Sequence, residues 1–128
     1  MEKETVKCEV IGRVENPVEK IPEDRSVFKE LESKIIIKPG LEEGLYRISE
    51  SEYVDIIFNF HLSGEYSLKC KTPHWGIKGV FACRSPKRPS RLGLTKVKLL
   101  ETGDNFIKVK GLDAVSGTPV IDIKPSIN

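Results

Sequence analysis

Short runs of β-branched and aromatic residues, each bounded by turn residues, constrain the fold of this chain more than any other feature. The strongest run is 53–62 (YVDIIFNFHL), in which aromatic and β-branched side chains predominate. About seven such runs follow one another with little helix between them, a pattern typical of small β-proteins. The sequence therefore predicts an all-β fold, either a barrel or a sandwich.

The turn residues predict how some of these strands are joined. Ser63-Gly64 would connect 53–62 to 65–71 in a hairpin, and T-G-D at 102–104 would form a second hairpin. Pro39-Gly40 marks a further turn. Helix is expected only as one turn within 15–33 and one or two turns within 41–49. We expect strands at 6–14, 35–37, 53–62, 65–71, 95–101, 105–110 and 118–124, with 80–82 leading into a loop.

Length and composition bound the class of protein. A chain of 128 residues with 38% hydrophobic and 31% charged residues is expected to fold as one domain with its own core. Its three cysteines form no C-x-x-C pair, which is a poor framework for disulfides and fits a reducing, cytoplasmic compartment. The sequence offers neither a signal peptide nor an apolar run long enough to span a membrane, so we expect no membrane partner.

Positive charge is concentrated in one segment. Residues 1–68 carry nine basic and fifteen acidic groups, whereas residues 69–98 carry nine basic groups and no acidic group. The whole chain has a formal net charge of only +2. Clustered charge focuses electrostatic potential, so this segment predicts a local face that binds an anion.

Two nucleotide-binding motifs and the usual zinc patterns are absent from the sequence. It contains neither G-x-G-x-x-G after a strand nor G-x-x-x-x-G-K-[ST], so neither a Rossmann site nor a P-loop is indicated. The spacing of His61, Cys70, His74 and Cys83 matches no common zinc site, and we expect no metal.

Two long motifs carry a family resemblance. They are GVFACRSPKRPSRLGL at 79–94 and GLDAVSGTPVIDIKP at 111–125, supported by IGRV at 11–14 and FNFH ending at His61. Together they resemble the TsaA-like family, the tRNA methyltransferases also called TrmO or YaeB. In that family Thr stands at position 83, Asn at 90, Pro at 91 and Asp at 116, where this chain has Cys, Ser, Arg and Ser.

The resemblance implies a fold and a reaction. The fold would be a small single-domain β-barrel over 1–128, without the C-terminal domain of many bacterial members. It would bind S-adenosyl-L-methionine without a Rossmann fold, usually as a homodimer. The reaction would be methyl transfer to N6 of a threonylcarbamoyl-adenosine beside the tRNA anticodon.

The resemblance also implies which residues touch the cofactor. An arginine of the first motif, a histidine at the end of the long strand and the loop of the second motif would form the site. Each has a plainer interpretation: a solvated basic loop, a structural histidine at a strand end, or a simple connection. The implied contacts are Lys38, His61, Leu62, Arg84, Leu94, Ala114, Val115, Ser116 and Gly117.

Further residues are candidates for tRNA binding and catalysis. Lys87 and Arg88 lie between Pro86 and Pro89, which stiffen the loop, Arg91 follows two residues later, and all three cations match phosphates. Trp75 either stacks on a base or anchors the core. Asp113 and Asp122 are the carboxylates of the second motif, and either could remove the N6 proton or merely orient Arg84 or a turn.

Two other functions stay open at this point. The chain could be an S-adenosyl-L-methionine-binding module or sensor without methyltransferase activity. It could also be a plain RNA-binding β-barrel, for which the basic segment alone would suffice.

Overall fold

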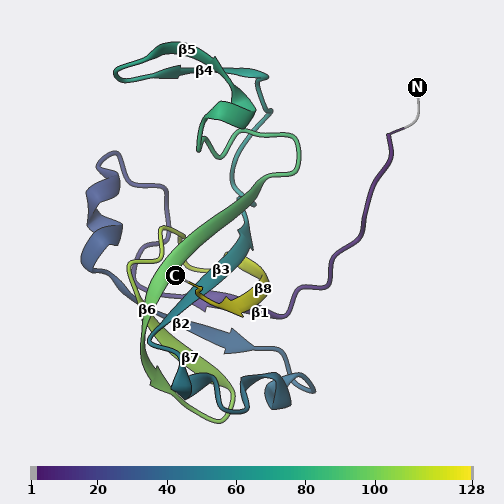
Figure 1. Ribbon diagram of the computed structural model, residues 1–128, viewed down its shortest axis with the longest axis vertical. Helices are drawn as coiled ribbons and strands as arrows, with labels where there is room; N and C mark the ends of the chain where they lie inside the picture. The colour runs from purple at the N-terminus through teal and green to yellow at the C-terminus, as the bar shows by residue number, and fades with distance from the viewer. Residues whose placement is uncertain (1–2, 128) are drawn as a thin grey trace.

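The computed structural model describes residues 3–127, and six of its strands form a closed barrel (Figure 1). Each neighbouring pair is antiparallel, and the strands close in the order β1-β2-β7-β6-β3-β8. The predicted all-β barrel with little helix is confirmed. The barrel strands are β1 (Gly12–Glu15), β2 (Glu32–Ile37), β3 (Tyr53–Asn59), β6 (Leu92–Thr102), β7 (Phe106–Lys110) and β8 (Pro119–Pro125).

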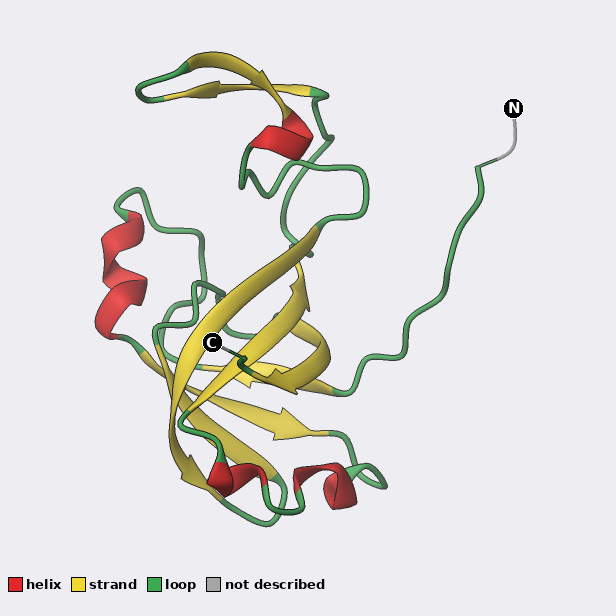
Figure 2. Cartoon of the chain, in the orientation of Figure 1, coloured by secondary structure: helices red, strands yellow, loops and turns green. Residues whose placement is uncertain are grey.

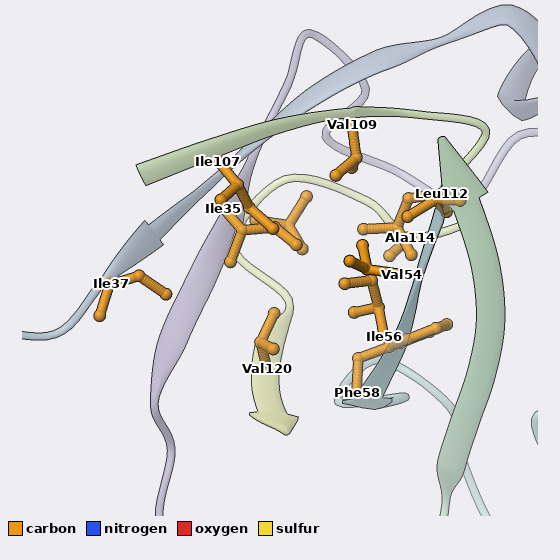
Figure 3. Packing of buried hydrophobic residues seen from close by; sticks show 12 residues of the cluster. Ile35, Ile37, Val54, Ile56, Phe58, Ile107, Val109, Leu112, Ala114 and Val120 are labelled. Carbon is orange, nitrogen blue, oxygen red and sulfur yellow. The ribbon is translucent and has the colours of Figure 1, made fainter. Parts of the chain in front are cut away.

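The barrel interior is filled by alternate residues of these strands, as a period of two requires. On β3, Val54, Ile56 and Phe58 are at most 1% exposed, while their neighbours are only partly covered. Figure 3 shows these side chains converging with Ile35 and Ile107 from the facing strands. Each buried aliphatic side chain contributes about 1.5–3 kcal/mol to folding, so this cluster is the main source of stability.

Within residues 3–127, helix is confined to short 3-10 turns (Figure 2). They are η1 (Arg25–Glu30), η2 (Glu42–Leu45), η3 (Ile48–Glu50) and η4 (Val80–Ala82). The first two fall inside the two segments where helical turns are predicted, and η3 begins in the second segment and ends one residue beyond it. Asp24 caps η1 by accepting a hydrogen bond from the Ser26 N–H at 3.0 Å, and its hydrogen bonds with Ser26 lower the pKa of the Asp24 carboxyl.

Two more strands form a separate hairpin that stands away from the barrel, opposite the end that carries η2 and η3 (Figure 1). They are β4 (Lys69–Thr72) and β5 (Gly76–Gly79), which pair only with each other. The predicted hairpin between 53–62 and 65–71 is therefore wrong. Both edges of β3 are already taken by β6 and β8, so no edge of β3 is open to the segment that follows it.

The predicted strand at 6–14 is also too long at its start. β1 begins only at Gly12, and residues 3–9 are exposed and irregular. The neighbouring β2 ends at Ile37, just before the turn at Pro39 and Gly40. Residues before Gly12 therefore have no strand beside them to complete a ladder, although Ile11 still bonds to Val120 and Lys38.

The cysteine prediction needs a correction as well. Cys70 of β4 and Cys83 form a disulfide across 13 residues of sequence, and Cys8 is free and exposed. Spacing in the sequence gave no sign of this pairing, because the hairpin turn at 72–76 brings the two residues together. Across residues 3–127, no helix is long and apolar enough to cross a membrane.

Candidate functional site

Two hollows adjoin at the end of the barrel where β3 ends and β6 begins. The narrow hollow has a volume of about 40 Å³, and the groove beside it about 500 Å³. Phe60 and Asp113 line both, so they form the shared wall. The narrow hollow is lined by Ile21, Arg25, Phe28, Phe58, Phe60, His61, Leu62, Ser63, Pro86, Asp113, Ala114, Val115 and Thr118. The groove is lined by Phe60, Phe81, Ala82, Cys83, Arg84, Ser85, Arg88, Leu92, Gly93, Leu94, Thr95 and Asp113.

The aromatic part of the shared wall depends on a glycine. Phe58 and Phe60 pack edge to face, with ring centroids 5.1 Å apart. Gly93 lies directly beneath both rings, and a Cβ at this position would come within 2.6 Å of Phe58 and 2.9 Å of Phe60. Gly93, the second glycine of the first motif, is therefore required for packing, because it lets the aromatic pair lie against β6.

The polar part of the shared wall is a carboxylate held in place by a strand residue. The Thr95 hydroxyl of β6 donates a hydrogen bond to Asp113 Oδ1 at 2.6 Å. Asp113 is half-buried and follows Leu112, which is fully buried in the core. The barrel thus fixes one carboxylate where both hollows meet, within reach of a ligand in either.

The basic loop 83–91, called here the arginine loop, is organised by its own guanidinium groups. Arg84 donates to the carbonyl oxygen of Leu94 at 2.7 Å, which attaches the loop to β6. Arg88 donates to the carbonyl oxygens of Cys83 at 2.8 Å and Ser85 at 3.3 Å. Both arginines line the groove, so their remaining donors can meet an anion there.

Arg91 has an unusual backbone conformation at the end of this loop. Its φ is 53°, in the left-handed region, and its carbonyl oxygen accepts from the Phe60 N–H at 2.8 Å. Proline, whose φ is fixed near −65°, cannot adopt this conformation. The replacement of the family's proline by arginine is therefore a change in loop geometry as well as in charge.

The loop of the second motif lies partly in the narrow hollow and partly outside it. Asp113, Ala114, Val115 and Thr118 line the hollow. The backbone N–H groups of Ser116 and Gly117 donate to Val18 and Val14, both at 2.7 Å, so they are already engaged. This side of the loop is bound to the segment around β1.

The structure brings together many of the residues predicted from the sequence and separates others. Those lining the two hollows are His61, Leu62, Arg84, Leu94, Ala114 and Val115 for the cofactor, Arg88 for tRNA and Asp113 for catalysis. Lys38 lies beside a different hollow with Arg13, and Asp122 lines another with Ile123. Ser116, Gly117, Lys87, Arg91 and Trp75 line neither of the two site hollows.

Two of the plainer interpretations can also be compared with the structure. His61 lies in an exposed turn two residues past the end of β3, and its N–H donates to the carbonyl of Asn59 at 2.8 Å. It is therefore not a strand-end residue. Trp75 is 73% exposed, which excludes a core anchor.

Several lining residues were not found from the sequence. Phe28 and Arg25 come from η1, which no motif marks, and the Arg25 guanidinium lies 5.8 Å from the Phe28 ring centre. Phe60 sits inside the quoted FNFH run, and Thr95 directly follows the first motif. These last two lie within or directly beside a motif, and that position is the signal that marks them. Within residues 3–127, no three His, Cys, Asp or Glu residues gather where they could hold a metal ion.

The fold and the site together define a class of protein: a small closed barrel with a cationic, partly apolar groove. The family model of the tRNA-methyltransferase O N-terminal domain matches residues 15–128. The chain belongs to this family. A crystal structure of TrmO from Pseudomonas aeruginosa superposes with a TM-score of 0.77 at 26% identity, covering 97% of this chain and 57% of the other.

Relatives in archaea and animals are similar in sequence. A protein of Pyrococcus abyssi named as a probable S-adenosyl-L-methionine-binding protein is 32% identical over 121 residues, 91% of this chain and 66% of that protein. The human tRNA (adenine(37)-N6)-methyltransferase is 40% identical over 90 residues, 67% of this chain and 20% of the enzyme. A shorter Archaeoglobus fulgidus S-adenosyl-L-methionine-binding protein is 36% identical, covering 76% of this chain and 70% of its own. The chain thus spans less than two thirds of several relatives.

Proposed function

We propose that this chain binds S-adenosyl-L-methionine in the two adjoining hollows and methylates N6 of threonylcarbamoyl-adenosine beside a tRNA anticodon. The observation that carries the proposal is the shared wall of Phe60 and Asp113, with an arginine in the adjoining groove. Membership of the tRNA-methyltransferase O N-terminal domain family supports it.

The residues present fit this cofactor in chemistry. Its adenine needs apolar surface, for which Phe60 and Leu94 are placed. Its carboxylate needs a cation, for which Arg84 is placed in the same groove. The groove volume of about 500 Å³ lies in the range of small-molecule sites, about 300–1,000 Å³. When bound, the cofactor supplies a methyl group on a positively charged sulfur.

On the acceptor side, this chain's residues would hold an anionic nucleotide and accept a proton. The threonyl carboxylate of the modified adenosine is an anion that Arg88 and Lys87 of the arginine loop can clamp. Asp113 is the better candidate for the base that takes the N6 proton, because Thr95 fixes it at the meeting point of both hollows. Asp122 forms an ion pair with Lys124 and lines another hollow, so it is less suited to a role in proton transfer.

The assembly and location follow from the same proposal. The proposal includes a homodimer. It also includes a cytoplasmic site of action, because tRNA modification takes place where tRNA is. Phe81, at the edge of the groove, is 82% exposed, which is consistent with a surface that a second copy covers.

A second candidate function is favoured by one observation. Archaeal relatives that match most of this chain are named as S-adenosyl-L-methionine-binding proteins, without a reaction. The chain could thus bind the cofactor and lack transferase activity. A plain RNA-binding barrel would bind RNA and no cofactor.

Calorimetric titration with S-adenosyl-L-methionine tests the cofactor site. Replacing Arg84 with Gln removes one charged hydrogen bond and should cost about 1–3 kcal/mol, or about 5- to 150-fold in Kd. The matched control is Arg47→Gln, because Arg47 is paired with Glu50 and lines neither of the two hollows. No binding by the wild-type protein, or equal loss in both variants, would contradict the proposed site.

A further inference from the structure

The β4–β5 hairpin is the part of the molecule that the proposed site leaves unexplained. Its side chains are mostly exposed, and its strands pair only with each other. It carries Lys69, Lys71 and Lys78 and no acidic residue. A backbone hydrogen bond from the Val80 N–H to the Leu68 carbonyl at 2.8 Å closes the base of the hairpin, and one from the Ser67 N–H to the Lys87 carbonyl at 3.5 Å joins that base to the arginine loop.

The strand register gives this hairpin two different faces. Residues directly opposite each other in an antiparallel pair lie on the same side. Lys71 and Ile77 therefore share one face, and Cys70 and Lys78 share the other. The Lys78 ammonium lies 5.6 Å from the centre of the Trp75 ring, which places the indole on the Cys70 side.

The disulfide fixes which face is turned toward the arginine loop. Cys70 is bonded to Cys83, the first residue of that loop and part of the groove lining. Trp75 and Lys78 are thus on the side from which the bond leaves the hairpin. Hydrogen bonds from Arg84 to Leu94 and from Arg88 to Cys83 also hold the arginine loop, in addition to the disulfide.

We propose that the hairpin and the arginine loop together form a binding surface for single-stranded RNA, and that the Cys70–Cys83 disulfide holds the two parts of this surface together. An exposed indole beside a lysine is a platform for a stacked base, and the arginine loop supplies cations for phosphates. This inference deepens the proposed function and rests on it. It adds a nucleotide flanking the methylated one as a contact, and it makes RNA affinity depend on the oxidation state of two cysteines.

The disulfide that joins the hairpin to the arginine loop can be broken by ordinary thiol–disulfide exchange. A dithiol reductant attacks the disulfide, its two sulfurs become oxidised to a cyclic disulfide, and Cys70 and Cys83 each receive one electron and one proton. The freed hairpin would then be held only at its base.

The probe is a fluorescent anticodon stem-loop RNA that carries threonylcarbamoyl-adenosine, with affinity read by anisotropy. Trp75→Ala should weaken binding by about 5- to 100-fold, as loss of one stacked base does. The matched control is Ile77→Ala: Ile77 is 70% exposed but lies on the opposite face, so its loss should change the affinity less than about twofold.

The disulfide is tested in the same assay as a thermodynamic cycle. The double variant Cys70→Ser with Cys83→Ser should lose most of the RNA affinity that Trp75→Ala loses. The variant with all three changes should bind RNA little more weakly than Trp75→Ala alone. Reduction of the wild-type protein with dithiothreitol should give the same loss without a mutation, and Cys8→Ser serves as the cysteine control. Additive losses in the cycle would overturn the tether, because Trp75 would then bind RNA without it.

The two failures can be told apart. Wild-type protein that binds no RNA contradicts the proposed function. If the wild-type protein binds RNA and Trp75→Ala binds it equally tightly, the proposed function stands and the RNA-binding role of the hairpin is refuted. A Trp75→Ala variant with unchanged RNA affinity but a smaller sedimentation coefficient would assign the hairpin to a protein interface instead.

Discussion

Replacing Gly93 with Ala should destabilise the barrel and damage the cofactor site together. The added Cβ would lie 2.6 Å and 2.8 Å from two ring atoms of Phe58 and 2.9 Å from Phe60, whereas ordinary contacts are 3.4–4 Å. The rings must therefore move by about half to one ångström. Phe58 is 1% exposed and surrounded by the core, so it has little room to yield.

The cost can be worked from that overlap. Overpacking a closely packed core by one methyl group costs about 1–3 kcal/mol. For a domain of this length that corresponds to a fall in Tm of about 3 to 12 °C. Because Phe60 also forms the wall between the two hollows, the affinity for S-adenosyl-L-methionine should fall as well.

The assay is urea denaturation followed by circular dichroism, with calorimetric titration of the folded variant. The matched control is Gly64→Ala, since a Cβ at Gly64 meets nothing within 4 Å and its φ is not positive. That variant should stay within about 0.5 kcal/mol of wild type. If Gly93→Ala is as stable as Gly64→Ala, then packing does not require a glycine at position 93, and the explanation is refuted.

Two further predictions concern the arginine loop. Changing Lys87 and Arg91 together to Gln should lower the log–log salt slope of RNA binding by about 1.4 to 1.8, since each lost phosphate contact removes about 0.7–0.9; an unchanged slope, measured by anisotropy across salt concentrations, would place the RNA elsewhere. Arg91→Gly should raise the free energy of unfolding by up to about 1 kcal/mol while weakening RNA binding, because glycine adopts a φ of 53° without steric cost. Destabilisation of this variant would contradict the left-handed conformation.

The strands that could be predicted are those whose pattern is local. The alternation along 53–62 and the T-G-D turn at 102–104 gave β3 and the β6–β7 hairpin, because both depend on neighbours in sequence. The Ser63-Gly64 signal failed for a related reason. A turn signal tells where the chain bends but not which strand it will meet, and β3 takes its partners from residues more than 30 positions away.

The site divides in the same way. Arg84, Leu94 and Asp113 lie in two long motifs, so the family resemblance carried them. Phe28 reaches the narrow hollow from η1, which lies more than 80 residues from Asp113, and no local pattern marks it. The Cys70–Cys83 disulfide depends on the pairing of β4 with β5, which no turn signal in the sequence indicates, so the disulfide could not be predicted.

The central claim is tested most directly by nucleoside mass spectrometry after incubation with methyl-labelled S-adenosyl-L-methionine. Two tRNA samples are compared, one carrying threonylcarbamoyl-adenosine beside the anticodon and one lacking it. The account predicts one labelled methyl on N6 of the modified nucleoside and none in the second sample, because only the first offers a carboxylate to the arginine loop. Label in both samples would contradict the carboxylate clamp, and label in neither, with cofactor binding intact, would contradict the assignment as a methyltransferase.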